Sequence, residues 1–104
     1  AITSDNAGPV SDPALGHVFW GKNAAVKTAE VVNNPSGGSQ CVTIRMRVTV
    51  PAGSTRYLLF FTEMSNSNGA AQTSISKFNT EGLSSSLLTG IKSSVRSKIV
   101  NWNL

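Results

Sequence analysis

The sequence predicts an α+β fold in which an antiparallel β-meander sheet is followed by C-terminal helices. Residues 41–50 alternate between apolar and polar side chains, which is the period-2 pattern of a half-buried antiparallel strand. Clusters of Gly, Pro, Asn and Ser divide residues 17–78 into short segments, as turns divide a meander. After residue 79 the apolar residues recur at intervals of three and four, which indicates an amphipathic helix.

The first half of the chain predicts an N-terminal extension followed by two strands. Residues 1–16 are rich in turn-forming residues, so we expect an N-terminal arm or a loose hairpin there. The antiparallel sheet is expected over residues 17–78, with its first strands at 17–20 and 25–32. The second of these ends at a strong turn signal, Asn33-Asn34-Pro35-Ser36-Gly37-Gly38.

The second half of the predicted sheet follows residues 41–50. Pro51-Ala52-Gly53-Ser54 predicts a turn, and residues 55–64 predict a strand that is apolar on both faces. Such a strand should lie centrally or against a partner. Residues 65–69 predict a second turn, because Asn68-Gly69 is a favoured hairpin pair, and a weaker strand is expected at 71–78.

The C-terminal helices are expected over residues 79–104. Asn79 is a suitable N-cap, and Glu81 lies in the first turn, where the helix dipole favours a negative charge. A break is expected near Gly90 or Ser93-Ser94. The apolar face of this helix consists of Leu83, Leu87, Leu88, Ile91, Val95, Ile99 and Trp102.

Composition indicates a single folded domain, residues 1–104. The 104 residues are 39% hydrophobic and only 13% charged, which is too apolar for a disordered tail. No apolar run approaches the roughly 18 residues of a membrane span, so we expect no membrane partner. A net charge of +4 favours polyanionic partners. So small a core also suggests a subunit that completes its core against a second copy of itself.

The residues that catalysis or metal binding requires are scarce. Cys41 and His17 are each the only residue of their type, which excludes an intrachain disulfide and argues against a zinc site. His17 lies in an apolar segment, where a histidine is more often packed than catalytic. We therefore expect no enzyme, cofactor, metal or small-molecule substrate, with a small hydrolase built around His17 as the remaining enzymatic alternative. Cys41 is most simply an apolar filler or an interface thiol.

The polar face of residues 41–50 is the best candidate for a binding surface. It presents two arginines flanked by two threonines: Thr43, Arg45, Arg47 and Thr49. On a flat sheet, such a face suits contacts with RNA phosphates and with bases splayed from a loop. The alternative is a solvated face, or arginines that pair with Glu30 and Glu63 on neighbouring strands.

An ordered set of segments resembles the coat proteins of single-stranded RNA bacteriophages. Val42-Thr43-Ile44-Arg45-Met46-Arg47, a short turn, and then Thr55-Arg56-Tyr57 opening an apolar strand resemble the central hairpin of that family. Asn79-Thr80-Glu81, a Ser- and Leu-rich helix and a short second helix near Ile99-Val100-Asn101 resemble its C-terminal part. The resemblance covers roughly residues 25–104.

This resemblance implies a structural capsid subunit. It implies an interlocked two-fold dimer with one continuous antiparallel sheet, in which the helices of each subunit pack on the partner's sheet. Dimers would assemble into an icosahedral shell around a single-stranded RNA genome, and the virion would form in the cytoplasm of a bacterial host. In several members the inner sheet face also binds an RNA hairpin and so represses translation of the replicase.

The resemblance also implies roles for particular residues. Thr43 and Arg45 fall where the family has RNA-contacting side chains, and Arg47 and Thr49 continue along the same face. Residues 65–70 would form the loop around the symmetry axes of the shell. The dimer interface would include residues of the apolar helix face, namely Leu87, Ile91, Val95, Ile99 and Trp102.

The alternative function is a secreted fibre or pilus-type structural subunit without nucleic-acid binding. The high content of Ser, Thr and Asn, the few charges and the first residue, Ala1, all permit it. Such a subunit would polymerise into filaments, whereas a capsid subunit would form uniform particles that contain RNA.

Overall fold

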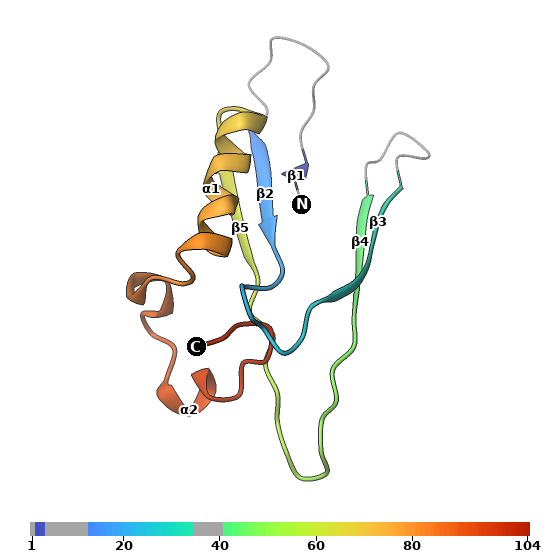
Figure 1. Cartoon of the computed structure of the whole chain (residues 1–104), viewed down its shortest axis with the longest axis vertical. Coiled ribbons are helices and arrows are strands. Elements are labelled where there is room, and N and C mark those ends of the chain that lie inside the picture. Colours follow the sequence, from blue (N-terminus) through green and yellow to red (C-terminus); the bar gives the residue numbers. More distant parts are fainter. Residues whose placement is uncertain (1, 4–12, 35–40) are drawn as a thin grey trace.

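The chain folds into two small antiparallel sheets and one long helix. The computed structural model describes residues 2–3, 13–34 and 41–104 (Figure 1). The predicted α+β class is confirmed in this described part. The strands differ from a single meander, however, because they divide between a three-stranded and a two-stranded sheet.

The three-stranded sheet has the order β1-β2-β5 and is antiparallel throughout. Its central strand is β2 (Ala14–Val18), with β1 (Ile2–Thr3) on one side and β5 (Phe61–Ser65) on the other. Because β1 pairs with the first half of β2, the described ends of the expected N-terminal hairpin lie side by side. Residues 4–12 of that expectation lie outside the described residues.

The second sheet is a two-stranded ribbon formed by β3 (Thr28–Asn34) and β4 (Cys41–Met46). Val31 pairs with Ile44 and Val32 with Thr43, and a bulge interrupts the register between Thr28 and Glu30. The strand predicted at 41–50 is therefore confirmed as far as Met46. Of the predicted turn at 33–38, the first two residues belong to β3, and residues 35–38 lie outside the described residues.

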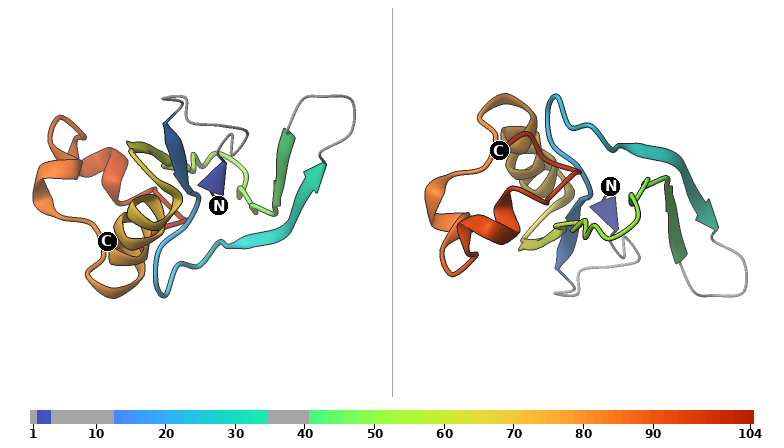
Figure 2. Two further views of the ribbon diagram at one scale, coloured as in Figure 1. Left: turned by 90° about the horizontal axis from the view of Figure 1, so that it is seen from above. Right: turned by 90° about the horizontal axis from the view of Figure 1, so that it is seen from below.

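The ribbon stands apart from the rest of the molecule in Figures 1 and 2. Within the described part of the chain, β3 and β4 contact each other and no other strand or helix. The residues that follow, 47–60, form a long loop. The turn predicted at residues 51–54 forms in this loop, since the Ser54 amide donates to the Pro51 carbonyl at 3.0 Å.

The strand predicted over residues 55–64 is shorter than expected. Only its C-terminal half becomes β5; before that, Tyr57 makes an isolated parallel bridge with Ile99. Because residues 55–64 are apolar on both faces, the sequence predicts that this strand lies centrally or against a partner. In the single chain, Leu58 and Phe60 are exposed.

Helix α1 (Asn68–Thr80) corrects three predictions at once. The expected hairpin turn at Asn68-Gly69 is the first turn of the helix, the expected strand at 71–78 is its middle, and Asn79 lies in its last turn and not at an N-cap. The true N-cap is Ser67, whose side chain accepts a hydrogen bond from the Ala70 amide. A capped turn of this kind favours a helix over a hairpin.

The C-terminal segment is less helical than predicted. The expected amphipathic helices over 79–104 reduce to a 3₁₀ turn, η2 (Ser85–Leu88), and one short helix, α2 (Ser93–Arg96). The predicted break is confirmed at Gly90, whose φ of 84° lies in the left-handed region that favours glycine. Repeated Ser residues further weaken helix formation here.

The core lies between α1, the three-stranded sheet and the C-terminal segment. Val18, Ile99 and Trp102 are buried at its centre, and the rings of Phe61 and Phe78 pack against Trp102 at centroid distances of 5.4 and 5.9 Å. Gly21 makes this packing possible, because a Cβ there would lie 2.3 Å from the Trp102 ring. No helix in the described part of the chain is long and apolar enough to cross a membrane.

Candidate nucleic-acid interface

The polar face of the ribbon contains two of the four residues predicted to contact RNA. Strand alternation in β4 places Thr43 and Arg45 on one exposed face, as the sequence predicts. Arg47 and Thr49 are also exposed, but they follow the end of β4 and belong to the long loop. The structure therefore holds two of the four residues in regular strand geometry.

Arg45 pairs with Glu30 across the ribbon. Its Nη1 lies 3.0 Å from Glu30 Oε2, and the two side chains are 68% and 47% exposed. The sequence left open that the arginines pair with Glu30 and Glu63, and the pairing with Glu30 is found. Within the described residues, the Glu63 carboxylate does not pair with an arginine and instead accepts hydrogen bonds from the Ser65 and Ser74 hydroxyls. An exposed ion pair contributes only about 0–1 kcal/mol, so an incoming phosphate can displace the carboxylate at small cost.

The opposite face of the ribbon is apolar and open. Paired residues in an antiparallel ribbon share a face, so Val31 lies beside Ile44 on the side away from Thr43 and Arg45. Val31 is 52% exposed, and Ile44 is half-buried. The ribbon thus presents a charged face and an apolar face with little protein covering either.

The three-stranded sheet also has one covered and one open face. Alternate residues of β2, beginning with Ala14, are buried toward α1. On the other face, Met64 of β5 is 75% exposed opposite Leu15, and the rings of Phe19 and Phe60 meet edge to face at 6.0 Å. This open apolar face was not predicted: the strand expected at 17–20 lies instead at 14–18, and its pairing with β5 joins segments far apart in the sequence.

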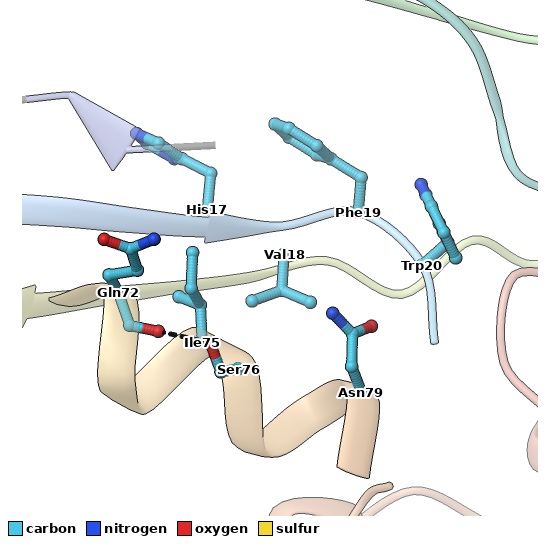
Figure 3. A pocket seen from close by; sticks show the side chains of 8 residues that line it. All are labelled: His17, Val18, Phe19, Trp20, Gln72, Ile75, Ser76 and Asn79. Atoms are coloured by element: carbon cyan, nitrogen blue, oxygen red, sulfur yellow. Dashed lines mark hydrogen bonds between the residues drawn. The ribbon is translucent and has the colours of Figure 1, made fainter. Parts of the chain in front are cut away.

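A pocket of about 260 Å³ opens between β2 and α1 (Figure 3). Figure 3 shows Val18 and Ile75 between the strand and the helix, with the amides of Gln72 and Asn79 on the helix side. The remaining lining residues are His17, Phe19, Trp20 and Ser76. Burial lowers the pKa of His17, whose Nδ1 lies 3.5 Å from the Thr62 hydroxyl. The described lining includes no Asp or Glu, so His17 is its one residue that titrates near neutral pH.

The residues predicted for the dimer interface fall into three groups by exposure. Ile99 and Trp102 lie in the core of the single chain, whereas Leu87 is 42% exposed. Ile91 and Val95 are half-buried. The structure therefore leaves Leu87 available for contact with another subunit, and the predicted role of the five residues in an interface stays a prediction.

Some basic side chains are held by the fold and others are exposed. Arg96 donates from Nε to the Ile91 carbonyl and from Nη2 to the Leu88 carbonyl, each at 2.7 Å, and so ties η2 to α2. The Lys27 ammonium lies 5.4 Å from the centroid of the Trp20 ring. The other basic residues with exposed side chains, apart from Arg45, are Lys22, Arg47, Arg56, Lys77, Lys92 and Lys98.

Comparisons of the chain with protein-family models, curated proteins and solved structures found no match. Among residues 2–3, 13–34 and 41–104, no three His, Cys, Asp or Glu side chains gather into a group that could hold a metal ion.

Proposed function

We propose that the chain is a capsid subunit that pairs with a second copy of itself and assembles into an icosahedral shell around single-stranded RNA. The observation that carries this proposal is the ribbon of β3 and β4, which contacts no other described strand or helix. An isolated two-stranded hairpin is marginally stable in water and needs further strands or a packed face. Pairing with a second copy supplies both.

The distribution of apolar surface supports self-association. Large apolar side chains are more than a third exposed on the ribbon, the long loop, β5 and η2: Val31, Val32, Val50, Tyr57, Leu58, Phe60, Met64 and Leu87. The radius of gyration is 15.6 Å, against about 13 Å for a compact chain of this length. An open subunit with this much apolar surface is what an interlocked oligomer requires before assembly.

RNA is the proposed cargo because of charge. The chain carries a net charge of +4, and the polar face of the ribbon holds Thr43 and Arg45 in exposed positions. Contacts of this type bind the phosphate backbone with little regard for sequence. The resemblance of residues 25–104 to bacteriophage coat proteins supports this assignment and implies that the assembled particle is a virion.

The test is to express the chain in bacteria, purify it without denaturant, and examine it by sedimentation velocity and electron microscopy. We expect uniform closed particles whose absorbance ratio at 260 and 280 nm indicates RNA. Nuclease treatment of intact particles should leave that ratio unchanged, which excludes RNA bound to the outside, and treatment after disassembly should lower it.

Two outcomes would contradict the proposal. A stable monomer in dilute buffer would show that the ribbon needs no partner. Filaments free of nucleic acid would support the fibre subunit instead, in which exposed strand edges add to the sheets of neighbouring copies.

A further inference from the structure

The bridge between Tyr57 and Ile99 brings two basic residues together from distant parts of the chain. The Tyr57 amide donates to the Lys98 carbonyl at 2.9 Å, and the Val100 amide donates to the Tyr57 carbonyl at 3.1 Å. Arg56 comes directly before Tyr57, and Lys98 comes directly before Ile99. Because the bridge is parallel, Arg56 and Lys98 lie side by side on the two adjacent segments. The hydrogen bond from the Tyr57 amide to the Lys98 carbonyl therefore brings the backbones of Arg56 and Lys98 next to each other.

The described acidic groups leave this pair of charges without a carboxylate. Of the three described glutamates, Glu30 pairs with Arg45, Glu63 accepts hydrogen bonds from two serine hydroxyls, and Glu81 is exposed and makes no ion pair. The Arg45–Glu30 contact is the ion pair found in the described part of the chain. Both Arg56 and Lys98 are exposed, and Arg56 donates from Nη1 to the Thr55 carbonyl. Like charges on adjacent segments repel, so a bound anion would stabilise this arrangement.

We propose that Arg56 and Lys98 form a phosphate-binding site for the backbone of single-stranded RNA. The proposal rests on the proposed function, since RNA is its ligand, and it adds a contact that lies off the ribbon. The guanidinium of Arg56 can hold two phosphate oxygens at once, and the ammonium of Lys98 acts as a point charge beside it. The backbones of both residues are anchored by a bridge at the buried core residue Ile99, so the two side chains start from fixed positions.

The test measures how binding of a labelled oligouridylate to the purified chain, freed of nucleic acid, depends on NaCl concentration. The double variant Arg56→Gln/Lys98→Gln is compared with the unaltered chain. Each phosphate contact to a single strand contributes about 0.7 to the slope of log K against log salt. We therefore expect the double variant to lose about 1.4 from that slope, and to bind more weakly at low salt.

Two further variants separate a local site from a general effect of charge. Lys77→Gln/Lys92→Gln removes the same net charge from α1 and from the residue before α2, and should keep the original slope. Arg56→Lys/Lys98→Arg keeps both charges and should also keep most of it. A slope in Arg56→Gln/Lys98→Gln equal to that of the unaltered chain would overturn this site while leaving RNA binding intact, and so would an equal loss in the control. Absence of oligouridylate binding by the unaltered chain would overturn the RNA part of the proposed function as well.

Discussion

Asn101 joins three segments of the chain through its side chain and its backbone. Its side chain is fully buried, donates from Nδ2 to the carbonyls of Phe19 and Leu59, and accepts from the Leu59 amide at 2.9 Å. Its own carbonyl accepts from the Gly21 amide. One amide therefore ties the end of β2, the start of β5 and the C-terminal segment, and it satisfies backbone groups that no regular sheet pairs there.

Replacing Asn101 should destabilise the fold strongly. Asn101→Ala leaves the Leu59 amide and the Phe19 carbonyl buried without their partner, and each such group costs about 1–3 kcal/mol. We expect a loss of roughly 2–5 kcal/mol in the free energy of unfolding, measured by urea titration at fixed protein concentration. Asn103→Ala, at an exposed asparagine two residues later, should change it by less than about 0.5 kcal/mol. Equal effects from the two variants would contradict the role assigned to Asn101.

His17 makes stability depend on pH near neutrality. Burial lowers its pKa from the ordinary value of 6.5, so the folded state favours the neutral ring. The stabilisation is then fully present above pH 6.5 and is lost as the pH falls below that value, because the unfolded chain binds the proton more readily. We expect Tm to decline between pH 7 and pH 5. His17→Gln should flatten this decline. If Tm of the variant still falls by the same amount between pH 7 and pH 5, the pH dependence comes from other titratable groups.

At the scale of elements, the sequence predicted the strands better than the helices. The alternation of residues 41–50 identified β4 and its exposed face, since period 2 is a strong signal even without a partner strand. Helix α1 was missed because Asn68-Gly69 matched a hairpin turn and the Ser- and Thr-rich segment after it has low helix propensity. The signal that could have found it is the spacing of Ala71, Ile75 and Phe78 behind a serine N-cap.

The serines and threonines of α1 also show why low helix propensity did not prevent a helix from forming here. Thr73 and Ser76 each donate to the carbonyl four residues earlier, at 3.0 and 2.7 Å. These hydroxyls are thus satisfied by the helix itself and do not compete with it. In residues 83–102 the reverse holds, because the apolar spacing correctly marked most inward-facing residues but not the lack of a long helix. Gly82 takes a positive φ just before this segment, and Gly90 takes one within it and divides it.

The N-cap of α1 provides a test at this scale. Ser67→Ala removes the hydrogen bond from the Ala70 amide, and the loss of such a cap costs about 1 kcal/mol. We expect that decrease in the free energy of unfolding, together with faster amide exchange in the first turn of the helix. Ser85→Ala, at an exposed serine in η2, is the matched control and should leave both quantities near their original values. Unchanged exchange in Ser67→Ala would mean that packing alone holds the first turn.

At the scale of the whole molecule, the candidate site could be predicted only in part. The sequence identified the polar face of β4 and offered Glu30 as a partner for its arginines, since both follow from strand alternation. It could not identify the open face of β2 and β5 or the neighbouring positions of Arg56 and Lys98. Those depend on pairing between segments more than 40 residues apart, for which local patterns carry no information.

The ribbon offers the sharpest test of how the molecule is completed. Val31 and Val32 are adjacent, similarly exposed at 52% and 42%, and lie on opposite faces, because Val31 pairs with Ile44 and Val32 with Thr43. If a second copy covers the apolar face, Val31→Thr buries a hydroxyl without a partner, at about 1–3 kcal/mol for each of the two copies. We expect the dissociation constant of the dimer to rise at least about tenfold, measured by sedimentation over a dilution series. Val32→Thr makes the same chemical change on the face with Arg45 and should leave the constant nearly unaltered. Because the two variants share strand propensity and composition, a similar loss in both would show that the ribbon itself had been weakened, and no loss in either would show that its apolar face stays open to water.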